Sequence, residues 1–101
     1  MANAFKSYQS VGVTTETTVL TGPASTETTI IGLTIANTAG VPTTATVKLN
    51  TAVMVKDAPI PVGGALIVVG GDQKVVVEAT DTIKVTADQA VDVITSTLEI
   101  A

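Results

Sequence analysis

The amino-acid sequence predicts an all-β fold, an antiparallel β-sandwich of about eight strands with immunoglobulin-like or jelly-roll topology. Three observations predict it. Val and Thr are abundant, and their β-branched side chains fit a pleated sheet better than a helix. Short runs of alternating apolar and polar residues recur at roughly 8–12-residue spacing between Gly, Pro, Asn and Asp clusters. No segment has the pattern of a helix of useful length.

Composition limits both the core and the chemistry. The 101 residues suit one domain, and 46% are hydrophobic although only 2% are aromatic, so the core must be aliphatic. The absence of Cys and His removes disulfides, thiolate nucleophiles, and the commonest general base and metal ligand. We therefore expect no catalytic residues, no cofactor and no metal, and we expect that the protein is not an enzyme.

Charge and hydropathy argue against two further classes. The formal net charge is −4, with five lysines and no arginine, whereas nucleic-acid binders carry a basic footprint. No stretch approaches the ~20 apolar residues of a membrane-spanning helix. The N-terminus lacks the apolar segment of a secretory signal. We expect the chain to fold in the cytoplasm, with neither nucleic acid nor a membrane as partner.

The N-terminal segment 1–10 lies outside the strand pattern. We expect an arm there, followed by a single β-sandwich domain over 11–101. The arm holds both aromatic residues of the chain, Phe5 and Tyr8. Neither has an obvious place in an aliphatic core, so both are candidates for an interface, where rigid aromatic anchors contribute most.

Two near-repeats follow the arm: TTETTVL at 14–20 and STETTII at 25–31. Gly22-Pro23 lies between them, and this pair favours a turn. The repeats are therefore expected to form a hairpin, or to be consecutive strands in two different sheets.

The remaining strands follow from the same alternation and are predicted over 26–38, 43–50, 51–57, 66–69, 73–79, 81–88 and 90–100. Pro59 and Pro61 remove two backbone donors, so segment 58–64 is expected to be an edge or a connection. The inward positions of these strands give the predicted core: Ile31, Leu33, Ile35, Val47, Leu49, Val75, Val77, Ile83, Val85 and Val93.

Tight turns are predicted at Asn37–Gly40, Gly70–Gln73 and Thr86–Ala90. Asn and Gly there would supply the positive φ angles that such turns need.

The last predicted strand changes parity. Val91 and Val93 share one face, whereas Ile94, Leu98 and Ile100 fall on the other. A bulge near Val93 and Ile94 would reconcile the two halves, as would a strand that faces the core at one end and a partner at the other. The candidate interface residues are therefore Phe5, Tyr8, Ile94, Leu98 and Ile100.

Carboxylates are the remaining candidates for chemistry, and they are Asp72, Glu78, Asp81, Asp88 and Asp92. A catalytic pair among them is disfavoured, since Asp and Glu usually occupy turns and solvent faces. Asp81, Asp88 and Asp92 would bind Ca²⁺ if the fold gathered them at one end of the sandwich, although the D-x-D-x-D-G spacing is missing. The alternative is that Asp81 and Asp88 flank a strand and bond to turn amides.

Four elements together resemble a known family. They are TGPA at Thr21–Ala24, IIGLTIAN at Ile30–Asn37, PIPVGGAL at Pro59–Leu66 and DTIKV at Asp81–Val85. Their order resembles that of the small β-sandwich structural proteins of tailed bacteriophages, notably cyanophages. The resemblance covers nearly the whole chain after residue 13, and it carries no catalytic residue.

The resemblance implies a role in the virion, most directly as a capsid decoration or cement protein that stabilises the particle through protein–protein contacts. A neck or tail component is the alternative. The implied partners are major capsid or neck and tail proteins and copies of the chain itself, in a homo-oligomer. The implied location is the virion, after folding in the host cytoplasm.

Two further expectations follow. Removal of segment 1–10 is expected to weaken particle binding while leaving the sandwich folded. A runner-up of a different class is a glycan- or Ca²⁺-binding β-sandwich module, although glycan sites usually stack sugars on exposed aromatic rings and this chain has two rings in all.

Overall fold

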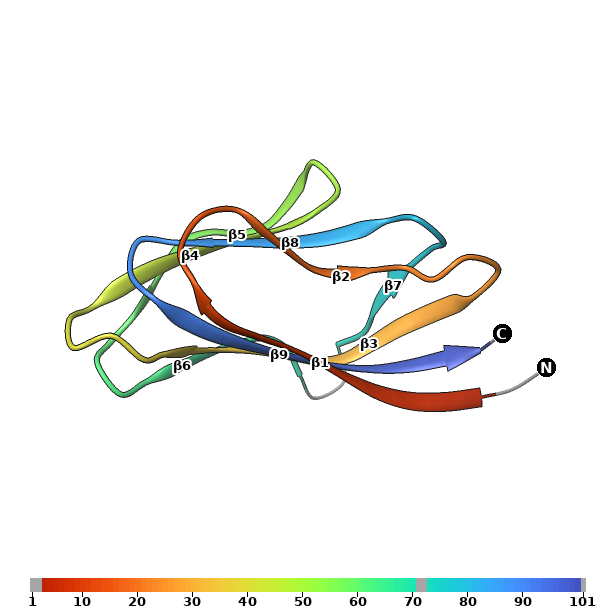
Figure 1. Cartoon of the computed structure of the whole chain (residues 1–101), viewed down its shortest axis with the longest axis horizontal. Helices are drawn as coiled ribbons and strands as arrows, with labels where there is room; N and C mark the ends of the chain where they lie inside the picture. The colour runs from red at the N-terminus through yellow and green to blue at the C-terminus, as the bar shows by residue number, and fades with distance from the viewer. Residues whose placement is uncertain (1–2, 71–72, 101) are drawn as a thin grey trace.

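A computed structural model describes residues 3–70 and 73–100, which contain nine β-strands and no helix (Figure 1). The strands are β1 (Asn3–Val13), β2 (Thr17–Thr21), β3 (Glu27–Asn37), β4 (Thr43–Leu49), β5 (Ala52–Ile60), β6 (Ala65–Val69), β7 (Val75–Val77), β8 (Thr82–Ala87) and β9 (Val91–Ile100).

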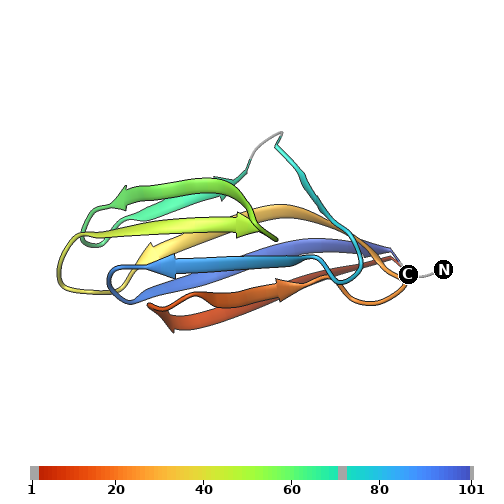
Figure 2. The ribbon, with the colours of Figure 1, turned by 90° about the horizontal axis from the view of Figure 1, so that it is seen from above.

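The strands form two antiparallel sheets that pack face to face (Figures 1 and 2). The five-stranded sheet has the order β1-β9-β3-β6, with β7 also paired to β3, and the four-stranded sheet has the order β2-β8-β4-β5. The predicted all-β antiparallel sandwich is confirmed. The strand count exceeds eight because β6 and β7 pair with successive parts of β3 and together occupy one strand position.

The topology is a jelly roll. The first half of the chain pairs with the second half in nested order: β1 with β9, β2 with β8, β3 with β6 and β7, and β4 with β5. A chain paired in this way is one long antiparallel hairpin. Two additional pairings, β3 with β9 and β4 with β8, roll the hairpin into two layers. Of the two predicted topologies, the jelly roll is the one that the chain adopts.

The core between the layers is aliphatic, as predicted. The predicted core residues that are buried are Leu33, Ile35, Val47, Val77, Ile83, Val85 and Val93. Leu49 and Val75 are partly buried and pack against this core from its margin.

Strand β3 departs from the prediction at Ile31. The register of its pairing with β9 shifts between Ile30 and Gly32, so β3 accommodates an irregularity there. Ile30 is fully buried and Ile31 only partly, before Leu33 returns to the core. Strand β9 keeps one unbroken register with β1 from Val93 to its end. The bulge predicted near Val93 and Ile94 is therefore absent, and the irregularity in β3 is a separate one that turns Ile31 away from the core.

The turn predicted at Asn37–Gly40 is stabilised by side-chain hydrogen bonds and not by the positive φ angles that we expected. Neither Asn37 nor Gly40 has a positive φ. The buried Asn37 amide instead donates hydrogen bonds to the carbonyl oxygens of Val41 and Ile60, at 2.9 and 3.1 Å. The side chain fixes the turn by cross-linking it to β5, so no left-handed residue is needed.

The other two predicted turns have different outcomes. The turn at Thr86–Ala90 is present, because β8 ends at Ala87 and β9 begins at Val91. The turn at Gly70–Gln73 contains Gly71 and Asp72, which lie outside the described residues.

The segment predicted as an arm belongs to a strand. From Asn3 to Ser10 every residue pairs with β9 in a single register, with Asn3 opposite Ile100 and Ser10 opposite Val93. As an edge strand it buries few side chains, so no clear alternation marks it in the sequence. Removal of 1–10 would take most of an edge strand out of the sheet, so we now expect it to destabilise the sandwich as well as to change its surface.

The two near-repeats lie in different sheets, the second of the two predicted arrangements. TTETTVL leads into β2, and STETTII leads into β3. Gly22 lies at the crossing between the layers. Its N–H donates to the carbonyl oxygen of Asp81 at 2.8 Å, and its own carbonyl accepts from the N–H of Thr80 at 2.9 Å.

Replacement of Gly22 by alanine should destabilise the sandwich. A Cβ at this position would overlap the backbone carbonyl oxygen of Glu78, which cannot rotate away. We expect the free energy of unfolding to fall by about 1–3 kcal/mol, as at overpacked sites. Urea denaturation followed by far-UV circular dichroism measures it. Gly40→Ala is the matched control, because a Cβ there meets nothing within 4 Å. Equal stability of the two variants would contradict this account.

Candidate interaction surface

The outward face of the five-stranded sheet carries a cluster of apolar side chains. Two cross-strand rows supply most of it: Phe5–Leu98–Thr29–Val76 and Gln9–Ile94–Thr34–Ile67. Neighbours in such rows lie close enough for their side chains to touch. We define the outer apolar face as Phe5, Ile67, Val76, Ile94, Leu98 and Ile100.

These side chains are well exposed for their size. Phe5 is 76% exposed, Ile67 68%, Val76 61% and Ile94 49%. Leu98, between Phe5 and Thr29 in its row, is half-buried. The row between the two apolar rows, Ser7–Ser96–Gly32, carries no apolar side chain, so the exposed apolar residues form two groups on one sheet face. A single exposed apolar residue is ordinary, but several on one face of a sheet are typical of an interaction surface.

The outer face of the four-stranded sheet is polar by comparison. Its two central strands, β4 and β8, alternate buried aliphatic residues with partly exposed polar ones: Thr44, Thr46, Lys48, Thr82, Lys84 and Thr86. Lys48 forms an ion pair with Glu16 at 3.7 Å. Val53, beside Lys48 on β5, is the exposed apolar exception. A sheet of this sandwich can therefore have a mainly polar outer face. The exposed apolar side chains of the five-stranded sheet are not required by the fold.

Directly beneath the outer apolar face, polar side chains interrupt the aliphatic interior. Strand β9 directs Thr95, Thr97 and Glu99 inward, and all three are buried. Thr28, opposite Glu99 on β3, is buried as well. The second half of β9 is therefore inverted, with polar side chains inside and apolar side chains outside.

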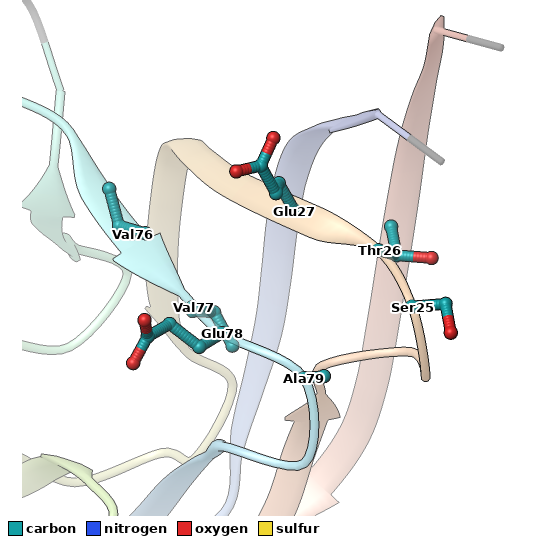
Figure 3. Close-up of a pocket in the computed structure, with 7 residues that line it drawn as sticks. All are labelled: Ser25, Thr26, Glu27, Val76, Val77, Glu78 and Ala79. Carbon is teal, nitrogen blue, oxygen red and sulfur yellow. The ribbon is translucent and has the colours of Figure 1, made fainter. Parts of the chain in front are cut away.

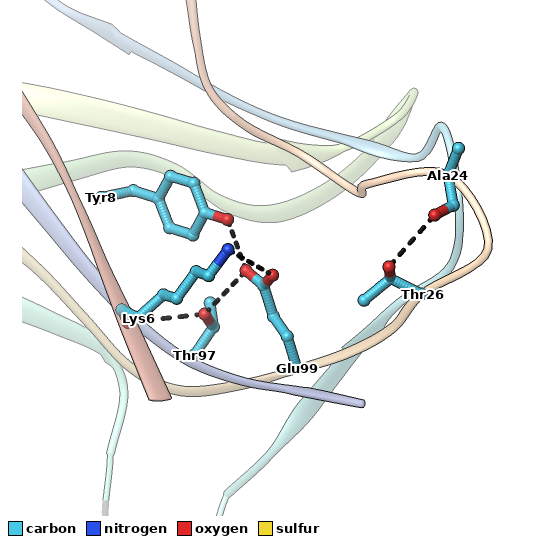
Figure 4. Close-up of polar contacts among 6 residues, drawn as sticks. All are labelled: Lys6, Tyr8, Ala24, Thr26, Thr97 and Glu99. Atoms are coloured by element: carbon cyan, nitrogen blue, oxygen red, sulfur yellow. Dashed lines mark hydrogen bonds and ion pairs between the residues drawn. The ribbon is translucent and has the colours of Figure 1, made fainter. Parts of the chain in front are cut away.

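Glu99 is held by side chains from two strands (Figure 4). The Tyr8 hydroxyl donates to Glu99 Oε2, Thr97 Oγ1 donates to the same oxygen at 3.2 Å, and Lys6 Nζ lies 3.6 Å from Oε1. A buried carboxylate requires partners of this kind, because burial removes its hydration. Since Lys6 and Tyr8 belong to β1, the carboxylate ties the first strand of the sandwich to the last.

The contact changes the acidity of Tyr8. The hydrogen bond to Glu99 raises the pKa of Tyr8 to about 12, and burial and the negative charge of Glu99 act in the same direction. Nearby, Thr28 Oγ1 and Thr95 Oγ1 are buried and have no hydrogen-bond partner among the described residues. Buried hydroxyls without a hydrogen bond cost stability. At this end of the interior, the stabilising polar contacts are therefore those of Glu99 with its partners.

The structure separates the predicted interface residues into two groups. Phe5, Ile94, Leu98 and Ile100 share the outer apolar face, whereas Tyr8 has the opposite parity on β1 and packs against the core. Ile67 and Val76 also belong to this face but were missing from the sequence-based set. Val76 has the parity opposite to the predicted core residues Val75 and Val77 but was not considered for an interface. Ile67 lies within the continuous apolar run ALIVV, which gives no indication of which residues face outward.

The carboxylates singled out in the sequence are not brought together. Asp81 and Asp88 flank opposite ends of β8, so the predicted cluster of three at one end of the sandwich does not form. Asp81 instead accepts hydrogen bonds from the Asn50 amide and the Glu78 N–H, both at 3.1 Å, and Asp92 accepts from Gly12 N–H at 3.0 Å. Asp72 lies outside the described residues. Residues 3–70 and 73–100 hold no group of three acidic, His or Cys side chains able to bind a metal.

A hollow of about 450 Å³ adjoins the outer apolar face, between Ser25–Glu27 and Val76–Ala79 (Figure 3). Its two carboxylates, Glu27 and Glu78, come from different segments and point in different directions. The hollow has no aromatic lining for a sugar, and no basic side chain lines it. We assign it no chemistry of its own.

In the part of the chain that the structure describes, no helix is long and apolar enough to cross a membrane. Comparison with known proteins finds no matching family model, no matching curated protein and no matching solved structure.

Titration of Tyr8 tests the contact with Glu99. Tyr8 is the sole tyrosine of the chain, so tyrosinate absorbance reports it alone. We expect a midpoint near pH 12 instead of 10, and a midpoint close to the ordinary value in Glu99→Gln. Because the pKa is higher in the folded state, the associated stability is fully present below about pH 10 and is lost as the pH rises towards 12. Tyr8→Phe should not show this alkaline loss in urea denaturation. A midpoint of 10 in the unmodified protein would refute the contact.

Proposed function

We propose that the protein is a non-enzymatic structural protein that acts by binding other proteins through the outer apolar face. One observation carries the proposal: both sheets direct aliphatic side chains into a shared core, yet one presents Phe5, Ile67 and Ile94 to solvent while the central strands of the other present Thr and Lys. Full burial of each large apolar side chain contributes roughly 1.5–3 kcal/mol. A partner that covers several of them gains enough to offset the entropy lost on association.

We place this binding protein in a bacteriophage virion, as a capsid decoration or cement protein, with a neck or tail component as the alternative. The resemblance of four sequence elements to small phage structural proteins supports this placement. Jelly rolls are also a recurrent architecture of viral capsid proteins, which supports it as a fold-level analogy. The partners are then other virion proteins and further copies of the chain, met after the chain has folded in the host cytoplasm.

Mass spectrometry of purified particles is the primary test of the virion placement. Particles from a lysate that expresses the chain should contain it at a fixed copy number. A copy number near that of the major capsid protein would identify decoration, and a copy number of a few per particle would identify the neck or tail. Recovery of the chain only in the soluble fraction would overturn the proposal.

Charge introduced on the outer apolar face should abolish particle binding. The double variant Ile67→Lys, Ile94→Lys loses two apolar side chains on one cross-strand row, and a loss of roughly 1.5–3 kcal/mol each implies at least about 100-fold weaker binding. Co-sedimentation with particles that lack the protein measures it. Thr44→Lys, Thr86→Lys is the matched control, since both residues are partly exposed on the outer face of the other sheet. Equal loss in both variants would exclude the outer apolar face as the binding site.

A further inference from the structure

We infer that β1 is the docking edge for a second copy of this chain, which pairs with it antiparallel about a two-fold axis to form one continuous sheet through both molecules. In residues 3–70 and 73–100, β1 pairs with β9 on one side and with no strand on the other. Figure 2 shows β1 along the margin of the molecule. The proposed function names further copies of the chain among the partners, and the inference specifies how two copies pair; it rests on this edge and not on particle binding.

The other edges of the sandwich carry features that discourage strand pairing. Strands β2 and β6 are five residues long, and β7 has three. Strand β5 contains Pro59, a positive φ at Asp57 and two register shifts against β4. Short strands, proline and irregular register are the usual means by which proteins protect a sheet edge.

Strand β1 has none of these features over most of its length. It spans eleven residues without proline, and its register with β9 is unbroken from Asn3 to Ser10. Its one charged side chain, Lys6, is on the inward parity and is ion-paired with Glu99 at 3.6 Å. The outward positions of β1 are uncharged: Asn3, Phe5, Ser7, Gln9 and Val11. An edge that is long, regular and without an unpaired charge is able to add a strand.

A second copy fits this edge because β1 is complementary to itself. With Ser7 on the two-fold axis, Phe5 lies opposite Gln9 of the second copy and Lys6 opposite its Tyr8, and every side chain keeps its own face. This register uses only the regular part of the strand. An axis through Lys6 would set two lysines opposite one another, which is unfavourable.

The dimer would also extend the outer apolar face. Strand β1 supplies Phe5 to that face, and the two-fold axis lies two residues away at Ser7. The faces of the two copies therefore meet across the axis and form one surface. The interface is the same patch on both molecules, so the assembly closes at two copies and does not grow into a fibre.

Cysteine cross-linking tests the pairing and its register. The chain has no cysteine, so Ser7→Cys introduces a sole thiol. Residues directly opposite in an antiparallel pair have Cα atoms about 4.5–5.5 Å apart, which suits a disulfide. We expect mild oxidation to convert Ser7→Cys into a covalent dimer on a non-reducing gel. Thr18→Cys, exposed on the edge strand β2, is the control and should stay monomeric.

A charge variant tests the same edge without a covalent bond. Ser7→Lys places two lysines on the two-fold axis and should weaken dimerisation roughly tenfold or more in sedimentation experiments. Far-UV circular dichroism should be unchanged, and so should the melting temperature at concentrations at which both proteins are monomeric, since Ser7 is exposed. Thr18→Lys should leave the dimer intact.

Three outcomes would overturn the inference. One is a protein that sediments as a monomer at every concentration and whose Ser7→Cys variant cross-links no faster than Thr18→Cys. Another is a dimer that persists unchanged in Ser7→Lys, which would assign association to another surface. A third is cross-linking at Thr18→Cys alone, which would assign it to β2. Each can occur whether or not the protein binds particles, so failure here is distinguishable from failure of the proposed function.

Discussion

The direction in which the side chains of β9 point, into the core or out to solvent, determines most of this structure, because β9 is paired on both sides, with β1 and with β3. Side chains alternate strictly along a strand, so one register places Glu99 inside and Ile94 outside. A slip of one residue would bring Ile94, Leu98 and Ile100 into the core, which hydrophobicity alone would favour. It would also expose Glu99 and break its hydrogen bond with Tyr8. The slip would also turn Val91 and Val93, both fully buried, out to solvent. Loss of these core contacts and of the Glu99–Tyr8 hydrogen bond opposes the slip and keeps an apolar surface turned towards solvent.

The sequence predicted those parts of the fold in which alternation and burial coincide. Leu33, Val47 and Val85 lie on strands with one polar face, so their inward direction could be inferred. Strand β1 could not be recognised, because an edge strand buries too few residues to show a period. The outward direction of Ile67 could not be inferred either, since its strand is apolar on both faces. The change of parity at Ile94 was visible, but only the three-dimensional pairing shows that it marks an inverted strand and not a bulge.

The inverted end of the sandwich connects stability with interaction. Glu99, Tyr8 and Lys6 hold β1 on the sheet from the inside, while Phe5, one residue along from Lys6, lies on the outside. The polar contacts thus fix the position of an exposed aromatic ring and of a free sheet edge. A protein that works by adhesion needs such rigid surfaces, because a mobile surface loses more entropy when a partner covers it.

The nested pairing also sets the order in which the chain is able to fold. Strands β4 and β5 form the innermost pair, and β1 with β9 the outermost. Direct pairing of β1 with β9 would close nearly the whole chain into one loop, at a large cost in chain entropy. If pairing starts at β4 and β5 and proceeds outward, the same entropy is lost in small steps. On the ribosome, β1 emerges first and β9 last. Strand β1, whose free edge we infer to bind a second copy, is therefore exposed for longest before β9 can pair with it, and shielding of that strand from other nascent chains would favour the folded protein.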